Sequence, residues 1–384
     1  MRLIRNGLVR QLPKKARREN LSRLRLLDPM LLLASLALSV FGICAVYVAV
    51  TDARQAYAID QGIGFVVGLA GAIPLTLIDY RVWQRFLRPI YGLVVAMLLA
   101  VTLIGAAAGG ATRWIAVGPV QVQPSEFAKL LMVVVLAGYF AEKPVGEHGV
   151  FVKALCILSV PGVLVFVQPD LGTALVFGAI FVVMAYVAGA RLIQLGGLAA
   201  ATVLSAVLAV KLHILEPYQV ARLTAFMNSG GDNTLGYQVA QSKLAIGSGG
   251  LIGKGLDAQT LSNLGFLPED HTDFIFSNLA ERVGFVGSLA LILLFFFLIW
   301  RILHVATISR DRFGVLIAVG VATIFLFHLF VNVGMTMGIM PVTGIPLPFI
   351  SYGRSNLVLS IISLGLLQSI AIRSRSEISK HPKV

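Results

Sequence analysis

Apolar residues occur along this chain in long uninterrupted segments that short polar stretches separate. A helix that crosses a membrane needs about 20 predominantly apolar residues. Ten segments approach or exceed that length, at residues 30–50, 60–79, 89–109, 122–141, 150–168, 171–189, 192–211, 277–300, 314–338 and 349–372. None alternates apolar and polar positions as a strand of a membrane β-barrel does. The pattern therefore predicts an all-α integral membrane protein with about ten transmembrane helices.

The composition supports this fold class and excludes several others. Hydrophobic residues make up 57% of the 384 residues and charged residues only 13%, and the mean hydropathy is +0.87. The charged fraction is about half that of an ordinary soluble domain, which excludes a typical cytosolic enzyme, a disordered chain and a secreted disulfide scaffold. Cys44 and Cys156 both fall inside apolar segments, which favours small core residues over a disulfide or metal pair.

The net charge of +13 is concentrated at the N-terminus and does not indicate nucleic acid binding. Nine of the 31 Lys and Arg residues precede residue 26, and no nucleic-acid-binding module accompanies them. With the N-terminus in the cytoplasm, 22 of the 31 fall on the inner side of the alternating topology, in agreement with the positive-inside rule. We expect a basic cytoplasmic tail at 1–29, a membrane domain at 30–372 and a cytoplasmic tail at 373–384, in the cytoplasmic (inner) membrane.

The longest polar segment, residues 212–276, lies between the seventh and eighth predicted helices on the outer side. A loop of this length in a compact protein is usually functional or disordered. Leu235, Val239 and Leu244 keep an approximately helical spacing, so we expect part of the loop to lie along the membrane interface.

Unusual polar residues gather at the outer ends of the predicted helices. A charge at the level of the hydrocarbon costs several kcal/mol unless it is paired or hydrated, so this many together predict a water-filled cleft that faces outward. They are Arg113, Trp114, Gln123, Ser125, Glu126, Lys129, Asp170, Thr173, and the polar residues of 268–273 and 351–355.

Glu126, Lys129 and Asp170 each have a structural explanation as well as a functional one, and the sequence leaves both open. Glu126 and Lys129 are three residues apart, so they can neutralise each other on one helix face or face a substrate. Asp170 can cap the sixth predicted helix, with Thr173 three residues later, or line the cleft.

The same holds for residues nearer the membrane surface. Trp114 can be an aromatic anchor at the interface, and His271 can be a hydrogen-bonded structural residue. A zinc site is not expected, because no second His or Cys lies at ligand spacing. Glu269, Asp270 and Asp273 can bind a divalent cation through their oxygens. No cofactor is evident, and Mg²⁺ or Mn²⁺ stays open.

Several longer sequence motifs in this chain resemble those of a known protein family. They are Gln-Ser-Lys-Leu-Ala-Ile-Gly-Ser-Gly-Gly-Leu at 241–251, Phe-Leu-Pro-Glu at 266–269, His-Thr-Asp-Phe-Ile-Phe at 271–276, the segment 341–353, and the motifs at 113–115, 123–129 and 168–173. On these motifs the chain resembles the SEDS family (shape, elongation, division and sporulation) from about residue 27 to the end of the tenth predicted helix. The Gln-Ser-Lys form is more similar to the elongation members than to the division members.

This resemblance implies a peptidoglycan glycosyltransferase that polymerises lipid II on the outer face of the membrane, with a class B penicillin-binding protein that crosslinks the glycan. It implies that Asp273 is the catalytic residue. The acceptor hydroxyl is a weak nucleophile, so a nearby carboxylate can act as general base, and the diphosphate leaving group needs cations. The residues expected to bind the substrate are Arg113, Trp114, Gln123, Ser125, Glu126, Lys129, Asp170, Thr173, Arg222, Gln241, Lys243, Glu269, His271, Thr272 and Ser351.

One departure from the family pattern lies at residue 354, where relatives commonly have glycine and this chain has arginine. We expect Arg354 to pair with Asp170, Glu269, Asp270 or Asp273. Two other functions stay open: a transporter that flips lipid II, and a non-catalytic scaffold for the penicillin-binding protein. Ten helices with intramembrane charges also suit a transporter, although here the charges gather at one mouth.

Overall fold

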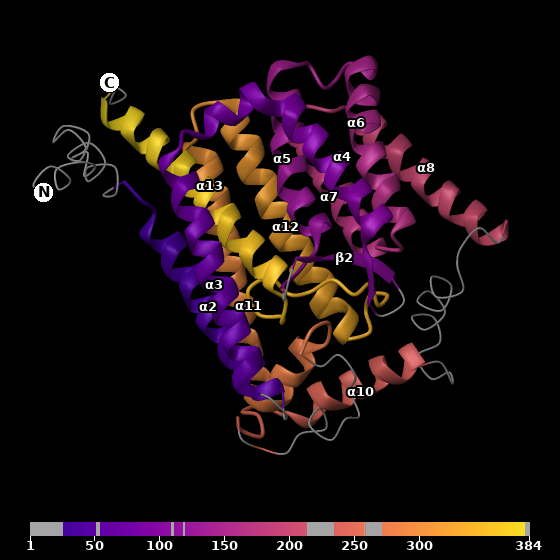
Figure 1. Ribbon diagram of the computed structural model, residues 1–384, viewed down its shortest axis with the longest axis vertical. Helices are drawn as coiled ribbons and strands as arrows, with labels where there is room; N and C mark the ends of the chain where they lie inside the picture. The colour runs from indigo at the N-terminus through magenta and orange to yellow at the C-terminus, as the bar shows by residue number, and fades with distance from the viewer. Residues whose placement is uncertain are drawn as a thin grey trace, which may run out of the picture.

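Ten apolar helices make up most of the structure, a computed structural model that describes residues 26–50, 54–108, 111–117, 120–212, 234–256, 258 and 271–380 (Figure 1). They are α2 (Pro29–Ala49), α3 (Arg54–Leu77), α4 (Leu87–Ile104), α5 (Pro124–Glu142), α6 (His148–Val167), α7 (Leu171–Val187), α8 (Leu192–Lys211), α11 (Ile275–Ile308), α12 (Arg312–Thr336) and α13 (Arg354–Lys380). A 3₁₀ turn, η1 (Tyr80–Phe86), precedes α4. Within these ranges nine helical segments are long and apolar enough to cross a membrane, and α7 is a shorter apolar helix. The prediction of an all-α membrane protein with about ten helices is confirmed.

Aspartate side chains define where three of these helices begin. The Asp28 carboxylate accepts the Leu31 N–H at 3.1 Å at the start of α2, and Asp311 accepts the Gly314 N–H at 2.7 Å at the start of α12. Asp170 caps α7 in the same way. An N-cap carboxylate satisfies a backbone donor that has no partner within the helix, so each polar start is held at a fixed position.

The interior of the bundle consists of α5, α12 and α13. Most of the residues in these three helices are buried, whereas α8 is almost entirely exposed. In Figure 1, α5 and α12 run through the middle of the molecule and α8 lies at its edge. Polar side chains on the three inner helices are therefore surrounded by protein, as ionisable groups within a membrane require.

A small antiparallel sheet connects α4 to α5. Its strands are β1 (Ala106–Ala108), β2 (Ala111–Val117) and β3 (Val120–Val122), in the order β1-β2-β3. The sequence predicted no strand here and extended the third helix to residue 109, but α4 ends at Ile104. The sheet matters for the site because β2 carries two of the predicted substrate-binding residues.

Helix α10 (Thr234–Ser248) occupies part of the predicted outer loop and packs against α11 and α12. Val239 of α10 is buried in a small apolar cluster with Phe274. The Ser242 hydroxyl donates to the Thr336 carbonyl at 2.6 Å. These contacts attach α10 to the ends of the two long helices.

A break in α11 at Gly284 is closed by the chain that follows α10. Gly284 has φ +68°, so the helix loses its regular hydrogen bonds around this point. The N–H groups of Phe285 and Val286 donate instead to the carbonyls of Gly250 at 2.9 Å and Leu251 at 3.1 Å.

The carbonyls on the other side of the break also find partners in this chain segment. Glu281 and Arg282 accept from the N–H groups of Lys254 at 3.1 Å and Gly255 at 3.0 Å. A Cβ at Gly253 would lie only 2.1 Å from the Arg282 carbonyl oxygen. This close backbone pairing thus requires glycine, and it satisfies the polar groups that an apolar environment could not.

Buried charges join α2, α11 and α13 at the other end of the bundle. The Asp28 carboxylate accepts from the guanidinium groups of Arg301 and, at 2.8 Å, Arg375. The Gln368 amide pairs with the Asp28 backbone in both directions, at 2.8 and 2.9 Å. We call these four residues the Asp28 cluster. Helix α13 reaches it because it continues to Lys380, beyond the predicted end at residue 372.

The Asp28 carboxyl group has a pKa below its ordinary value. Burial alone raises this pKa, but the Leu31 N–H and the two guanidinium groups lower it by more. A carboxyl group whose pKa is lower in the folded protein stabilises the fold above its unfolded pKa, and this contribution disappears as the pH falls through the folded pKa. The contribution of Asp28 is therefore complete at neutral pH.

We predict that Asp28→Asn destabilises the protein by about 3–5 kcal/mol, the cost of removing one partner from a buried ion pair. Arg301, whose side chain is 9% exposed, would lose its carboxylate. Thermal unfolding in detergent measures the effect, and the difference from wild type should shrink at strongly acidic pH. Glu142→Gln is the control, because Glu142 is exposed and its carboxylate accepts from the Gln84 amide at 2.9 Å; an equal loss there would contradict the prediction.

Candidate active site

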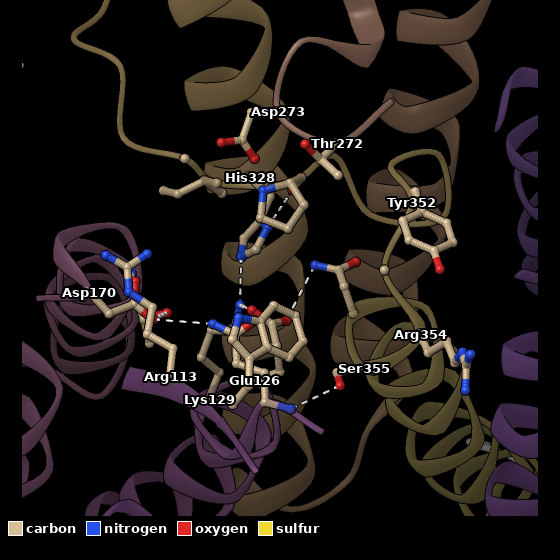
Figure 2. A pocket seen from close by; sticks show the side chains of 18 of the residues that line it. Arg113, Glu126, Lys129, Asp170, Thr272, Asp273, His328, Tyr352, Arg354 and Ser355 are labelled. Carbon is tan, nitrogen blue, oxygen red and sulfur yellow. Dashed lines mark hydrogen bonds and ion pairs between the residues drawn. The ribbon is translucent and has the colours of Figure 1, made fainter. Parts of the chain in front are cut away.

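A cavity of about 490 Å³ lies between strand β2, helices α5, α7 and α12, and the first turn of α13. Nine of the sixteen residues predicted for the site line it, and Figure 2 shows most of them converging on one space. They are Arg113, Trp114, Gln123, Glu126, Lys129, Asp170, Thr173, Thr272 and Asp273.

A buried lysine lies at the centre of one wall. The Lys129 ammonium is 2.8 Å from a carboxylate oxygen of Glu126, and both side chains are almost completely buried. The second Glu126 oxygen accepts from the Asn356 amide at 3.3 Å. Glu126 and Lys129 therefore neutralise each other, as one alternative from the sequence held, and both also line the cavity; contact with a substrate stays a prediction.

His328 on α12 is the second partner of Lys129. Its Nε2 is 3.1 Å from the Lys129 ammonium, and its Nδ1 is 2.9 Å from the Pro346 carbonyl oxygen. An ammonium group only donates and a carbonyl only accepts, so Nε2 accepts and Nδ1 carries the proton. His328 is thus neutral in this arrangement, and its Nε2 helps to fix the position of the Lys129 ammonium group.

Asp170 both caps α7 and forms part of the cavity wall. Its carboxylate accepts the Thr173 N–H at 3.1 Å and the Thr173 hydroxyl at 2.9 Å. It also accepts from Ser125 at 3.2 Å and Gln123 at 3.3 Å. Ser125 does not line the cavity but holds this carboxylate from behind.

Strand β2 places Arg113 and Trp114 on the wall of the cavity. The Arg113 guanidinium donates to the carbonyls of Pro169 and, at 3.4 Å, Gln168. Gln168 in turn donates to the Leu98 carbonyl at 2.6 Å. The cation is thereby attached to the turn that precedes α7 and remains at the cavity wall.

Asp273 is half-buried and lies immediately before α11. Figure 2 shows Asp273 and Thr272 at one edge of the cavity, with His328 between Asp273 and Lys129 in this view. The Asp273 backbone carbonyl accepts from the Asn332 side chain at 3.0 Å. A carboxylate and a buried cation thus face a single polar space.

Five predicted site residues lie behind or away from the cavity. Ser125 and Ser351 are buried and bond other site residues. The His271 ring packs edge-on against Tyr57 at 5.4 Å, and Gln241 and Lys243 lie on α10. Arg222 and Glu269 lie outside the described residues.

The expectation for Arg354 was wrong about its partner. Its guanidinium pairs with Asp60 of α3, with Nε 2.8 Å from the carboxylate. The Tyr352 hydroxyl donates to the same carboxylate at 2.8 Å, and burial together with Asp60 raises the pKa of Tyr352 to about 12. Asp60 was overlooked because it begins an apolar segment.

His328 was also missed, because it belongs to no motif and sits alone in the apolar segment 314–338. The one signal that could have found it is that an ionisable residue within a span is usually functional. Across the described ranges no group of three His, Cys, Asp or Glu side chains is arranged to hold a metal ion.

Comparison with known proteins agrees with the motifs. The family model described as cell cycle protein FtsW/RodA/SpoVE matches residues 26–376. The chain is 36% identical over 363 residues to a protein of Trichlorobacter lovleyi named probable peptidoglycan glycosyltransferase FtsW, covering 91% of this chain and 94% of that one. It is also 36% identical over 350 residues to the peptidoglycan glycosyltransferase MrdB of Escherichia coli K12, covering 90% and 93%.

Solved structures agree as well. A chain from a peptidoglycan synthase complex, described as coordinating polymerization and crosslinking, superposes with a TM-score of 0.80 at 28% identity and covers 91% of this chain and 98% of that one. The rod shape determining protein RodA of Thermus thermophilus has a TM-score of 0.68 at 28% identity, covering 90% and 96%. The resemblance inferred from the motifs is confirmed, and the chain belongs to the FtsW/RodA/SpoVE family of cell cycle proteins.

Proposed function

We propose that this chain is a peptidoglycan glycosyltransferase that polymerises lipid II into glycan strands. The observation that carries the proposal is the cavity itself, in which the Asp273 carboxylate and the buried Lys129 ammonium face one polar space. Glycosyl transfer from a diphosphate needs these two kinds of group, a proton acceptor for the nucleophile and a cation for the leaving group.

In this reaction the hydroxyl oxygen of the acceptor sugar forms a bond to the anomeric carbon of the donor. The bond between that carbon and the diphosphate oxygen breaks, and its electron pair leaves on undecaprenyl diphosphate. Asp273 accepts the hydroxyl proton. Lys129 and Arg113, both at the cavity wall, neutralise the diphosphate charge.

The other predicted residues bind the rest of the substrate. Gln123, Glu126, Asp170, Thr173 and Thr272 line the cavity and offer hydrogen bonds to the sugars and the diphosphate. Lipid II also carries a pentapeptide and a polyprenyl chain that extend beyond the cavity. Gln241, Lys243, Arg222 and Glu269 remain proposed contacts for those parts, and a Mg²⁺ or Mn²⁺ ion on the diphosphate remains a proposal too.

The partner we propose is a class B penicillin-binding protein, and the physiological role is cell elongation. The similarity to a chain of a peptidoglycan synthase complex supports the partner. The Gln-Ser-Lys motif at 241–243 supports the elongation role, although identity to FtsW and to MrdB is the same 36%.

We further propose that both ends of the chain are cytoplasmic and that the cavity faces outward from the cytoplasmic membrane. The distribution of Lys and Arg supports this orientation. The contact between Arg375 and Asp28 puts the start of α2 and the end of α13 at one end of the bundle, while the cavity lies at the first turn of α13.

Cysteine labelling tests the orientation. In a variant with Cys44→Ser and Cys156→Ser, a cysteine at Asn233, directly before α10 in the sequence, should react with an impermeant thiol reagent in intact cells. A cysteine at Ser376, near the end of α13, should react only after lysis. The reverse pattern would show that the cavity faces the cytoplasm.

We predict that Asp273→Asn reduces glycan polymer formation by about 10²–10⁴-fold, the usual contribution of a general base. The substitution keeps the side-chain volume and removes proton acceptance, so lipid II binding should be retained. The assay uses purified protein with its partner, labelled lipid II, and parallel reactions with Mg²⁺ or EDTA; polymer lost only in EDTA supports the cation.

The control for this experiment is Asp79→Asn, since Asp79 is a partly exposed carboxylate at the opposite end of the bundle. It should keep wild-type activity. Polymerisation by Asp273→Asn at nearly the wild-type rate would remove Asp273 from the mechanism. Wild-type protein that moves lipid II across vesicles but forms no polymer would favour the transporter instead.

Lys129→Gln separates a structural role of the cation from a chemical one. Glutamine keeps N–H donors for Glu126 and His328 but lacks the charge. We predict a loss of about 10²–10³-fold in turnover, the cost of removing one group that stabilises developing negative charge.

The matched control is Lys254→Gln. Lys254 also pairs with a buried carboxylate, that of Glu281 at 2.7 Å, but it does not line the cavity. This variant should keep its activity. If Lys129→Gln polymerises as fast as Lys254→Gln, the buried ammonium only balances Glu126.

A further inference from the structure

We infer that Asn332 and Ser351 are positioning residues that orient Asp273 by holding the backbone of residues 271–273, here called the catalytic segment. The inference rests on the proposed role of Asp273 as the general base. Neither Asn332 nor Ser351 lines the cavity, so both would act through the catalytic segment.

All three backbone carbonyls of the catalytic segment accept hydrogen bonds from distant parts of the chain. The Tyr352 N–H donates to the His271 carbonyl at 2.9 Å. The Ser351 hydroxyl donates to the Thr272 carbonyl at 2.7 Å. The Asn332 amide donates to the Asp273 carbonyl at 3.0 Å. The segment lies before the first residue of α11, and these donors join it to α12 and to the residues that precede α13.

Each of the two side chains makes two hydrogen bonds in this arrangement. Asn332 is completely buried, and its amide nitrogen donates to the Ile345 carbonyl at 2.8 Å in addition to Asp273. The Ser351 hydroxyl also accepts the Leu347 N–H at 2.8 Å. Each residue therefore joins the catalytic segment to residues 345–347, and neither can turn away without leaving a buried polar group unsatisfied.

Helix α3 supports the donors from the other side. The Gln61 amide donates to the Ser351 carbonyl at 3.1 Å and accepts the Gly353 N–H at 3.4 Å. Asp60 accepts the Tyr352 hydroxyl at 2.8 Å, and the Tyr57 and Tyr352 rings are 4.8 Å apart. The segment before α13 that carries Ser351 and Tyr352 is thus held against helix α3.

The consequence for catalysis follows from the length of an aspartate side chain. Only two rotatable bonds separate its carboxylate from the backbone, so the direction of the backbone sets where the base can reach. A displacement of about 1 Å at a reacting group can cost about 10²-fold in rate. Loss of the donors should therefore lower turnover without weakening the binding of lipid II.

The test uses Asn332→Asp in the full-length protein with its partner, because this change replaces the two N–H donors by an oxygen that repels both carbonyls. We expect kcat to fall about 10- to 100-fold with KM for lipid II unchanged. Thr323→Val is the matched control, since Thr323 is also buried on α12 but its hydroxyl donates to the Val319 carbonyl of its own helix.

Ser351 provides a second variant in case Asn332→Asp does not fold. Ser351→Ala should lower kcat in the same way, and Ser351→Thr, which keeps the hydroxyl, should restore it. The inference would be overturned if the Ser351→Ala protein had the kcat of wild type. It would also be overturned if the Ser351→Thr protein were as slow as Ser351→Ala.

Combining the changes distinguishes positioning from general support of the fold. If Asn332 acts only through Asp273, adding Asn332→Asp to Asp273→Asn should cause no further loss of the residual rate. An equal loss in both backgrounds, or a rise in KM alone, would overturn the inference. Full activity of Asp273→Asn by itself would instead overturn the proposed role of Asp273 as the general base, so a failure of that role and a failure of the positioning inference can be told apart.

Discussion

The structure depends on a positive charge buried inside an apolar bundle. The Lys129 ammonium would be strongly unfavourable there without partners. Glu126 of α5 and His328 of α12 supply them, and Asn356 of α13 binds the second Glu126 oxygen. The three innermost helices therefore meet around one charge, and the polar cavity lies beside it. The Asp28 cluster applies the same principle at the other end of α13, where one buried carboxylate joins three helices.

Much of the fold could be predicted because its signals are local. Runs of about 20 apolar residues mark each span, and caps such as Asp28 and Asp170 lie directly at the helix starts they stabilise. The polar motifs at helix ends located most of the cavity for the same reason, since a polar residue within an apolar chain stands out. The sheet between α4 and α5 could not be predicted, because strands of three alanines, such as β1, carry no alternation of apolar and polar positions.

The parts of the site that the sequence did not reveal depend on contacts between distant segments. His328 reaches Lys129 across 199 positions, and Asp60 reaches Arg354 across 294. No spacing rule relates such pairs, because they are adjacent only after the helices have packed. Asp60 lies within the apolar helix α3, so the sequence counted it as one residue of a span and did not show that its charge pairs with Arg354.

The motif residues divide into two groups that a single sequence cannot separate. Thr272 and Asp273 line the cavity, whereas their neighbour His271 packs against aromatic rings and the Ser351 hydroxyl bonds backbone groups. Both groups consist of polar residues beside apolar segments, so both stand out equally in the sequence. The proposed role of Asp273 as a base requires a fixed direction of its carboxylate, which supporting hydrogen bonds help to supply. Each of the three backbone carbonyls of residues 271–273 has a donor. Such support is what the proposed reaction requires, because it depends on the direction of one carboxylate.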